Sequence, residues 1–394
     1  MIPFSPPRVD DKTIEAVSEA LRSGWITTGP RTKDFEKKLA AYLNSKLVAC
    51  FNSWTTAAEL ALKWYDIRRG DEVVVPVYTY AASANIVAHL GATIVPVDSA
   101  PGVFNTSTEI INSAITHKTK AVMPVDIGGL PAQGGFPSGS LFKAASANQE
   151  KLGRPLLLSD AAHSFGATIG SQHASLSADV AGFSFHAVKN LTTAEGGALS
   201  FNLPDDFDID EIYRWFMRMS LHGQTKDALA KTAGASWRYD ILEHGYKCNM
   251  TDLQAAIGLV ELGRYAETLT KRKSICERYS QAFAANDWAE LPPVVDGIES
   301  SNHLYMLRIR GIDEGTRDKI IDEIIANGVS VNVHFQPLPL LTVFKKLGWK
   351  MEDFPNAWNA YSREISLPVY YDLTDDQANK VIDTVIKAVQ KFIC

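Results

Sequence analysis

Two side chains in this sequence have the types and the surroundings that an amine-based reaction needs. Lys189 follows an apolar run at 181–185, and a lysine held against apolar residues loses part of its charge and becomes a nucleophile toward aldehydes. Asp160 ends a second apolar run at 156–159, where its carboxylate could hold a protonated ring nitrogen. Either residue alone predicts little, because most lysines are solvated and a lone aspartate after a strand commonly caps a turn. Together, 29 residues apart, they predict a pyridoxal-phosphate enzyme in which Lys189 forms the Schiff base and Asp160 pairs with the pyridine nitrogen.

Hydroxyl side chains open a helical pattern earlier in the chain. Thr55 and Thr56 stand at the start of the pattern 55–65, shortly after a predicted strand at 46–50. Free N–H groups at a helix start and neighbouring hydroxyls can hold a phosphate, although serine and threonine are also common helix caps. Tyr80 lies at another strand-to-helix corner, where its ring could stack on a planar cofactor or pack in the core.

The elements that must position these residues are short β-rich runs alternating with helical patterns, which is typical of a parallel sheet covered by helices. The predicted strands are 46–50, 72–77, 93–97, 121–125, 156–159, 181–185 and 198–201. The helices between them include 55–65, 81–89 and 107–116. Because parallel strands bring their carboxyl ends to one edge, we expect the candidate residues to meet there. The predicted fold class is α/β.

Beyond residue 202 the pattern changes. A polar, irregular stretch at 220–247 leads to a helix opened by the capping-box sequence Thr251-Asp252-Leu253-Gln254. Later patterns predict a small α+β domain, with strands at 303–309 and 329–334, a helix near 314–327 and a terminal helix from about 374. We therefore expect a large α/β domain at 1–250, which includes the N-terminal segment, and a linking helix with a smaller C-terminal domain at 251–394.

Composition excludes several classes of function. The 394 residues are 46% hydrophobic and 21% charged, which suits a large buried core. The net charge of -6 is spread along the chain without a basic block, so we expect no nucleic-acid partner. The chain has no apolar run long enough to cross a membrane and no signal-peptide pattern, so we expect a cytoplasmic protein. Four scattered cysteines without a Cys-x-x-Cys pair predict reduced, mostly buried thiols and no metal site.

The motifs as a set resemble the DegT/StrS family of pyridoxal-phosphate-dependent sugar-nucleotide aminotransferases. The resemblance runs from the segment 24–30 to the C-terminal helix, and its most specific blocks are 160–166 and 183–197. It is closest to enzymes that aminate C4 of UDP-4-keto sugars, such as the UDP-4-amino-4-deoxy-L-arabinose aminotransferases. The resemblance implies fold type I, as in aspartate aminotransferase, with a mostly parallel seven-stranded sheet, helices on both faces and a smaller C-terminal α+β domain. It also implies a homodimer with shared active sites, which uses glutamate and returns 2-oxoglutarate, with pyridoxamine phosphate as the amino form of the cofactor.

The resemblance also assigns roles residue by residue. It makes Lys189 and Asp160 catalytic, and both also bind the cofactor, whose further contacts would be Thr55, Thr56, Tyr80, His163, Ser184 and Asn249. His163 would touch the phenolic side of the ring, or be a satisfied core histidine. Asn249 would reach the phosphate of the neighbouring subunit, or simply precede a capped helix. His334 is similar to a family segment near the sugar nucleotide, so we expect it to bind substrate.

Three departures from the family bear on the substrate. Trp54 is larger than the small residue common there, 132–146 is longer and richer in glycine and serine, and 220–247 does not match closely. Loops often decide substrate preference, so C3 amination of a dTDP- or GDP-keto sugar stays open as an alternative. So does a regulatory protein that keeps the fold without the chemistry. The family's deoxygenating branch carries histidine in place of Lys189, and a nicotinamide dehydrogenase would need a Gly-x-Gly-x-x-Gly turn that is missing after the first strand.

Overall fold

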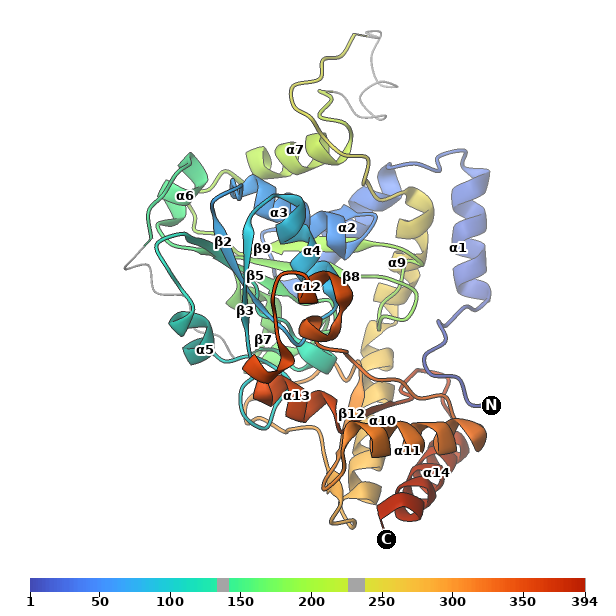
Figure 1. Ribbon diagram of the computed structural model, residues 1–394. Coiled ribbons are helices and arrows are strands. Elements are labelled where there is room, and N and C mark those ends of the chain that lie inside the picture. The colour runs from blue at the N-terminus through green and yellow to red at the C-terminus, as the bar shows by residue number, and fades with distance from the viewer. Residues whose placement is uncertain (133–141, 226–237, 394) are drawn as a thin grey trace.

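The computed structural model describes residues 1–132, 142–225 and 238–393 (Figure 1). Its helices are α1 Asp11–Arg22, α2 Pro30–Leu43, α3 Trp54–Trp64, α4 Ala81–His89, α5 Thr108–Ser113, α6 Ala147–Leu152, α7 Ile209–Ser220, α9 Asp252–Gly263, α10 Tyr265–Phe283, α11 Glu314–Ala326, α12 Thr342–Lys345, α13 Pro355–Tyr361 and α14 Asp375–Ile393. None of the helices in these ranges is long and apolar enough to span a membrane. Most of the segment 132–146 and part of 220–247 lie outside the described residues.

A seven-stranded sheet forms the centre of the molecule, in the order β1-β9-β8-β5-β4-β2-β3. Its strands are β1 Leu47–Phe51, β2 Glu72–Pro76, β3 Thr93–Val97, β4 Thr119–Val122, β5 Leu156–Asp160, β8 Val180–Ser184 and β9 Gly197–Phe201. The pairs among β2, β3, β4, β5 and β8 are parallel, whereas β9 runs antiparallel to both of its neighbours. All seven strands were predicted within a few residues, and the mostly parallel α/β class is confirmed.

Both faces of the sheet are buried under helices, because successive residues of a strand point to opposite sides. In β1, Ala49 and Phe51 pack into a core with α3 and α7, whereas Val48 and Cys50 pack into a core with α2 and α9. A strand covered by helices on both sides needs apolar residues at every position, and β1 is buried along its whole length. Because helices cover both faces of the sheet, polar side chains that could bind a ligand are expected at the ends of the strands.

The remaining strands form two small sheets. One has the order β10-β12-β13, from Ala289–Glu290, Tyr305–Ile309 and Glu364–Leu367, and packs with α10, α11 and α14 into a separate core. The other joins β11 Ile298–Glu299 to the hairpin of β6 Thr168–Ile169 and β7 Gln172–His173. In Figure 1, α11 and α14 lie side by side near the C-terminus, away from the main sheet. The division after residue 250 stays a prediction.

One predicted strand is wrong. The segment 329–334 forms only isolated bridges, from Val329 to Ile2 and from Asn332 to Ser366. The backbone N–H of His334 donates to the side chain of Glu364 at 3.0 Å instead of to a neighbouring strand. The side chain of Glu364 therefore accepts the hydrogen bond that a neighbouring strand would accept in a sheet. The alternation of apolar residues in the sequence gives no sign of this contact. The capping box is confirmed, with Thr251 and Gln254 bonding each other's backbone at the start of α9.

Candidate active site

A cavity of about 390 Å³ opens at the sheet edge where the parallel strands end. Asp160 ends β5 and Ser184 ends β8, while Thr55 lies in the first turn of α3, after β1, and Tyr80 directly precedes α4, after β2. Seven of the nine predicted site residues line this cavity, namely Thr55, Tyr80, Asp160, His163, Ser184, Lys189 and His334. Thr56 and Asn249 do not belong to its lining.

Lys189 sits on the turn beyond β8, and its backbone N–H donates to His186 O at 2.9 Å. Burial lowers the pKa of its ammonium to about 8, and the nearby charge of Asp160 opposes that change. A lysine with an ordinary pKa would be almost entirely charged at neutral pH. The surroundings of Lys189 therefore give it a substantial neutral fraction, which is the form that attacks an aldehyde.

Asp160 is a buried carboxylate with few partners. Its Oδ2 accepts a hydrogen bond from the Ser83 hydroxyl at 2.7 Å, and its Oδ1 accepts a longer one from the backbone of Ala162 at 3.3 Å. Burial raises the pKa of Asp160 to about 6, against the effects of these two bonds and of Lys189. The side chain is thus mostly ionised at neutral pH and retains room for another donor.

The hydrogen-bonding state of His163 follows from its backbone contact. Its Nδ1 lies 3.2 Å from the N–H of Gly128, which can only donate, so Nδ1 accepts and Nε2 carries the proton. The ring packs 4.3 Å from that of His303 and 5.5 Å from that of Phe335. Burial, with Lys189 nearby, holds the pKa of His163 well below its usual value, so the ring is neutral. It offers the cavity an N–H donor.

The start of α3 approaches the sheet closely enough to need glycine beneath it. Ser53 caps the helix by accepting from Thr56 N at 3.2 Å, and the Thr56 hydroxyl donates to Asn52 at 2.7 Å. A side chain at Gly197 would come within 2.3 Å of Trp54 N, and one at Gly182 within 2.7 Å of Trp54 Nε1. Thr55 lies on the cavity wall, and the amide groups at a helix start are suited to an anion.

Two aromatic or imidazole side chains and one amide complete the predicted set. Tyr80 is 66% exposed at the rim, with its ring 6.0 Å from that of Phe335. His334 is half-buried, and its Nδ1 lies 2.9 Å from the Ser366 hydroxyl. Asn249 lies outside the lining of this cavity, and its side-chain amide donates to the Thr28 hydroxyl at 2.6 Å.

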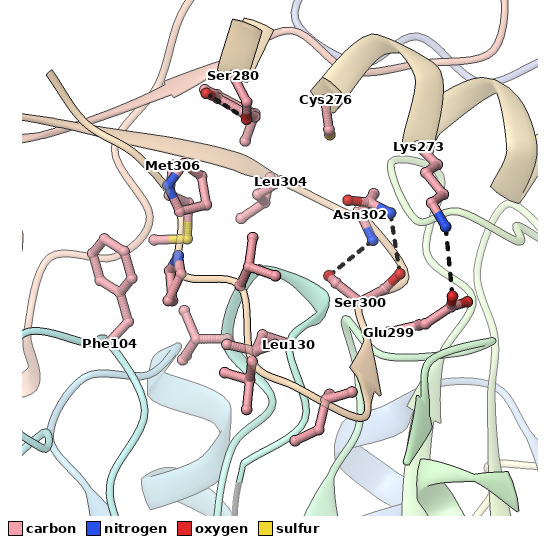
Figure 2. A pocket seen from close by; sticks show the side chains of 18 of the residues that line it. Phe104, Leu130, Lys273, Cys276, Ser280, Glu299, Ser300, Asn302, Leu304 and Met306 are labelled. Carbon is pink, nitrogen blue, oxygen red and sulfur yellow. Dashed lines mark hydrogen bonds and ion pairs between the residues drawn. The ribbon is translucent and has the colours of Figure 1, made fainter. Parts of the chain in front are cut away.

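A second and larger cavity, of about 480 Å³, shares no lining residue with the first. Figure 2 shows Phe104, Leu130 and Met306 around it, with an ion pair of 3.5 Å between Lys273 and Glu299 at one side. Its lining includes Cys276, but burial raises the pKa of that thiol to about 12, so it is not a nucleophile. None of the nine predicted residues lines it, whereas seven of them line the smaller cavity. Among the described residues, no group of three histidine, cysteine or acidic side chains is placed to hold a metal ion.

Several residues of the site were not predicted. Ser83 bonds Asp160, His303 contacts His163, and Phe335 faces both Tyr80 and His163. Ser83 lies in the first turn of α4, close to Tyr80, so the strand-to-helix corner was itself a usable signal. His303 and Phe335 come from the other end of the chain, and only the folded structure brings them here.

The sequence pattern of the DegT/DnrJ/EryC1/StrS aminotransferase family matches residues 7–386. The chain belongs to this family. It is 36% identical to the spore coat polysaccharide biosynthesis protein SpsC of Bacillus subtilis, over 98% of this chain and 96% of that protein. It is 35% identical to the uncharacterized protein MJ1066 of Methanocaldococcus jannaschii, over 99% and 98%.

A solved structure is also similar along the whole chain. The putative sugar aminotransferase Spr1654 from Streptococcus pneumoniae, in its PMP-form, has 41% identity and a TM-score of 0.94, with both chains fully covered. Its PLP-form has 40% identity and a TM-score of 0.93, again with full coverage of both. Family membership and these neighbours confirm the expected type of fold and the expected enzyme class, an aminotransferase.

Proposed function

We propose that this protein transfers the amino group of glutamate to a nucleotide-linked keto sugar, at C4 of a UDP-4-keto sugar. The observation that carries the proposal is the meeting of Lys189 and Asp160 in one cavity, at the sheet edge of a sugar aminotransferase fold. The name of SpsC, a polysaccharide biosynthesis protein, supports an amino sugar destined for cell-surface polysaccharide or lipopolysaccharide.

The cofactor is pyridoxal phosphate, and the described residues fit it. The close approach of α3 to Gly197 makes a corner that a larger side chain would fill, and Thr55 and Ser184 add hydroxyls on the cavity wall. Asp160 retains an acceptor for a protonated ring nitrogen, and the Nε2–H of His163 can donate to the phenolic oxygen. Tyr80 provides a ring at the cavity rim.

When bound, pyridoxal phosphate accepts the electrons that proton removal leaves on carbon and carries the amino group between substrates. The chain itself supplies position and proton transfer. Asp160 would keep the ring nitrogen protonated, and the amine of Lys189 would remove the proton from the α-carbon of glutamate and hold it for transfer. With the keto sugar in place, Lys189 moves a proton in the opposite direction, to the sugar carbon that receives nitrogen. Glutamate leaves as 2-oxoglutarate before the sugar enters, so ping-pong kinetics follow.

Replacement of Lys189 tests this function. Lys189→Ala should fold and still bind the cofactor non-covalently, but amination should fall by at least about 100- to 10,000-fold, because one amine serves every proton transfer. Mass detection of products, with glutamate and a panel of UDP-, GDP- and dTDP-linked keto sugars, measures both the loss and the preferred sugar. In the wild-type apoprotein, cofactor capture should accelerate as the pH rises through about 8, where Lys189 loses its proton. Near-normal amination by the variant would refute the assignment.

The active site is proposed to be completed by a second copy of the chain. The described parts of 221–247 extend beyond α7, away from the sheet (Figure 1), and Tyr239, Ile241 and Leu242 are 54%, 49% and 54% exposed there. Exposed apolar residues of this kind favour a protein contact. Asn249 follows the segment 221–247 directly, and its backbone forms an isolated β-bridge with Phe51.

Mixing two inactive variants tests the shared site. If Asn249 serves the neighbouring subunit, Lys189→Ala and Asn249→Ala chains should form mixed dimers with one intact site each. Random exchange would then restore roughly a quarter of the wild-type activity. If Asn249 served its own subunit, no site would be restored, and the mixture would give only the sum of its parts.

A further inference from the structure

A hydrogen-bonded chain runs from the buried acid Glu364 to His334 on the cavity wall. Glu364 and Ser366 both lie on β13, two residues apart and therefore on the same face of the strand. The Ser366 Oγ is 2.5 Å from Glu364 Oε1 and 2.9 Å from His334 Nδ1. Glu364 Oε2 accepts from the backbone N–H of His334 at 3.0 Å, and the Tyr78 hydroxyl donates to His334 O at 2.6 Å. His334 is thus fixed at both its backbone and its ring.

The surroundings of Glu364 favour its neutral form. Its side chain is fully buried, as is that of Ser366. Two arginines exert their charge on it, but Arg308 forms its ion pair with Glu290, and Arg317 forms its ion pairs with Glu314 and Asp318. Burial raises the pKa of Glu364 to about 8, with smaller opposing effects from its hydrogen bonds and these arginines. Because burial is the largest of these effects and no described basic side chain forms an ion pair with Glu364, its neutral form is favoured at neutral pH.

The geometry directs that proton. A backbone N–H can only donate, so Oε2 of Glu364 must accept and the acid proton must lie on Oε1. With the acid neutral, Oε1 becomes the donor across its 2.5 Å contact with Ser366 Oγ, and the serine hydroxyl is then free to donate to His334 Nδ1. With Nδ1 accepting, the proton of the neutral imidazole is on Nε2, the ring nitrogen left for a ligand. The chain of donors therefore runs outward, from the core to the cavity.

We propose that Glu364 acts as a neutral acid which, through Ser366, makes His334 a hydrogen-bond donor to an oxygen of the sugar substrate. The identity of that substrate rests on the proposed function. The N–H of Gly128 donates to Nδ1 of His163, so that ring also carries its proton on Nε2. Two neutral imidazoles thus present Nε2–H groups to one cavity. Lys189 disfavours a charged ring at His334, whose pKa burial lowers to about 3. Glu364 and Ser366 are positioning residues, since neither lines the cavity.

Nitrogen NMR of the histidine rings tests the direction of the chain. The protein has nine histidines, and the signals lost in His334→Ala identify that ring. At pH 7, wild-type His334 should show the Nε2–H tautomer. Glu364→Gln should retain it, because the amide N–H can donate to Ser366 while the amide oxygen accepts from His334 N. A wild-type Nδ1–H tautomer would overturn the proposal, and so would a switch of tautomer in Glu364→Gln, because both mean that Glu364 is a carboxylate.

Kinetics separate this role from a purely structural one. Ser366→Ala and Glu364→Ala should raise the KM for the keto sugar by about tenfold, the effect of one lost hydrogen bond, and leave the glutamate half-reaction nearly intact. Glu364→Gln should rescue the loss seen in Glu364→Ala. Ser280→Ala, on α10 beside Tyr305, is the matched control. Equal damage to both half-reactions would overturn the proposal, whereas failure to aminate any keto sugar would refute the proposed function and leave the tautomer result standing.

Discussion

Two buried aspartates in this protein have opposite surroundings. Asp252, at the start of α9, is completely buried and accepts hydrogen bonds from Gly29 N at 2.8 Å, Arg31 N at 3.0 Å, and both the backbone and the hydroxyl of Thr32 at 2.9 and 2.7 Å. Asp160 is almost as buried but accepts one strong and one long hydrogen bond. The first carboxylate is saturated by the chain, and the second is not.

The difference separates structure from function. The donors to Asp252 are three amides and one hydroxyl at the start of α2, so its carboxylate caps that helix and joins it to α9. Nothing is left on Asp252 for a ligand to bind. Asp160 faces a cavity with spare acceptor capacity, which the protein tolerates only at a cost in desolvation. Counting the donors around a buried carboxylate therefore distinguishes a structural acid from one reserved for a ligand.

The largest effect should come from Asp160→Asn. Amination should fall by roughly 100- to 1,000-fold, because the ring nitrogen of the cofactor loses the charge that keeps it protonated. The free energy of unfolding of the apoprotein should stay the same or rise, since the uncompensated buried charge is removed. Steady-state kinetics and urea unfolding measure the two quantities. A stability loss as large as the one expected for Asp252 would break the comparison.

The next effect should come from Asp252→Ala, and it should be on stability. Removing the carboxylate leaves the buried N–H groups of Gly29 and Thr32 without acceptors, at about 1 kcal/mol or more each. We expect the free energy of unfolding to fall by about 3 kcal/mol, seen as a lower urea midpoint. The folded fraction should retain its cofactor absorption and turnover. Selective loss of activity at full stability would contradict a structural role.

The smallest effect should come from Ser83→Ala, which removes the shorter of the two hydrogen bonds that Asp160 accepts. Without its strongest donor, the pKa of Asp160 should rise above about 6, so less of it is ionised near neutral pH. Cofactor affinity of the apoprotein should weaken by about tenfold at about pH 6.5, with the deficit shrinking by about pH 8.5 as Asp160 ionises again. Comparison with wild type at each pH cancels the titration of Lys189, and the exposed Ser113→Ala is a control. A deficit that does not vary with pH would indicate a packing defect.

The sequence predicted best what depends on neighbouring residues. Asp160 ends one buried apolar strand and Lys189 comes shortly after another, so their place at the sheet edge could be predicted from short segments. Asp252 was seen only as part of a capping box, because its partners Gly29 and Thr32 are more than 200 residues away. The strand that carries Glu364 and Ser366 was not predicted at all, and their partner His334 is about 30 residues away in the sequence. Contacts between distant segments decide hydrogen bonding, and no local pattern records them.

The supposed strand at 329–334 illustrates a second limit. Its apolar alternation suits a strand, yet the chain there turns to bring His334 to the cavity and bonds a side chain of β13. Functional segments depart from regular structure because a ligand site needs particular side chains in particular places.

The contact between Trp54 and Gly182 restricts the history of this site. An alanine at 182 cannot coexist with the indole in its present position, because the added carbon would meet Nε1 at 2.7 Å and Cδ1 at 3.1 Å. A lineage that acquired the tryptophan must already have had glycine at 182, or have held the indole in a different position in the interval. The two positions therefore constrain each other, because alanine at 182 can be tolerated only after Trp54 has been replaced by a smaller residue.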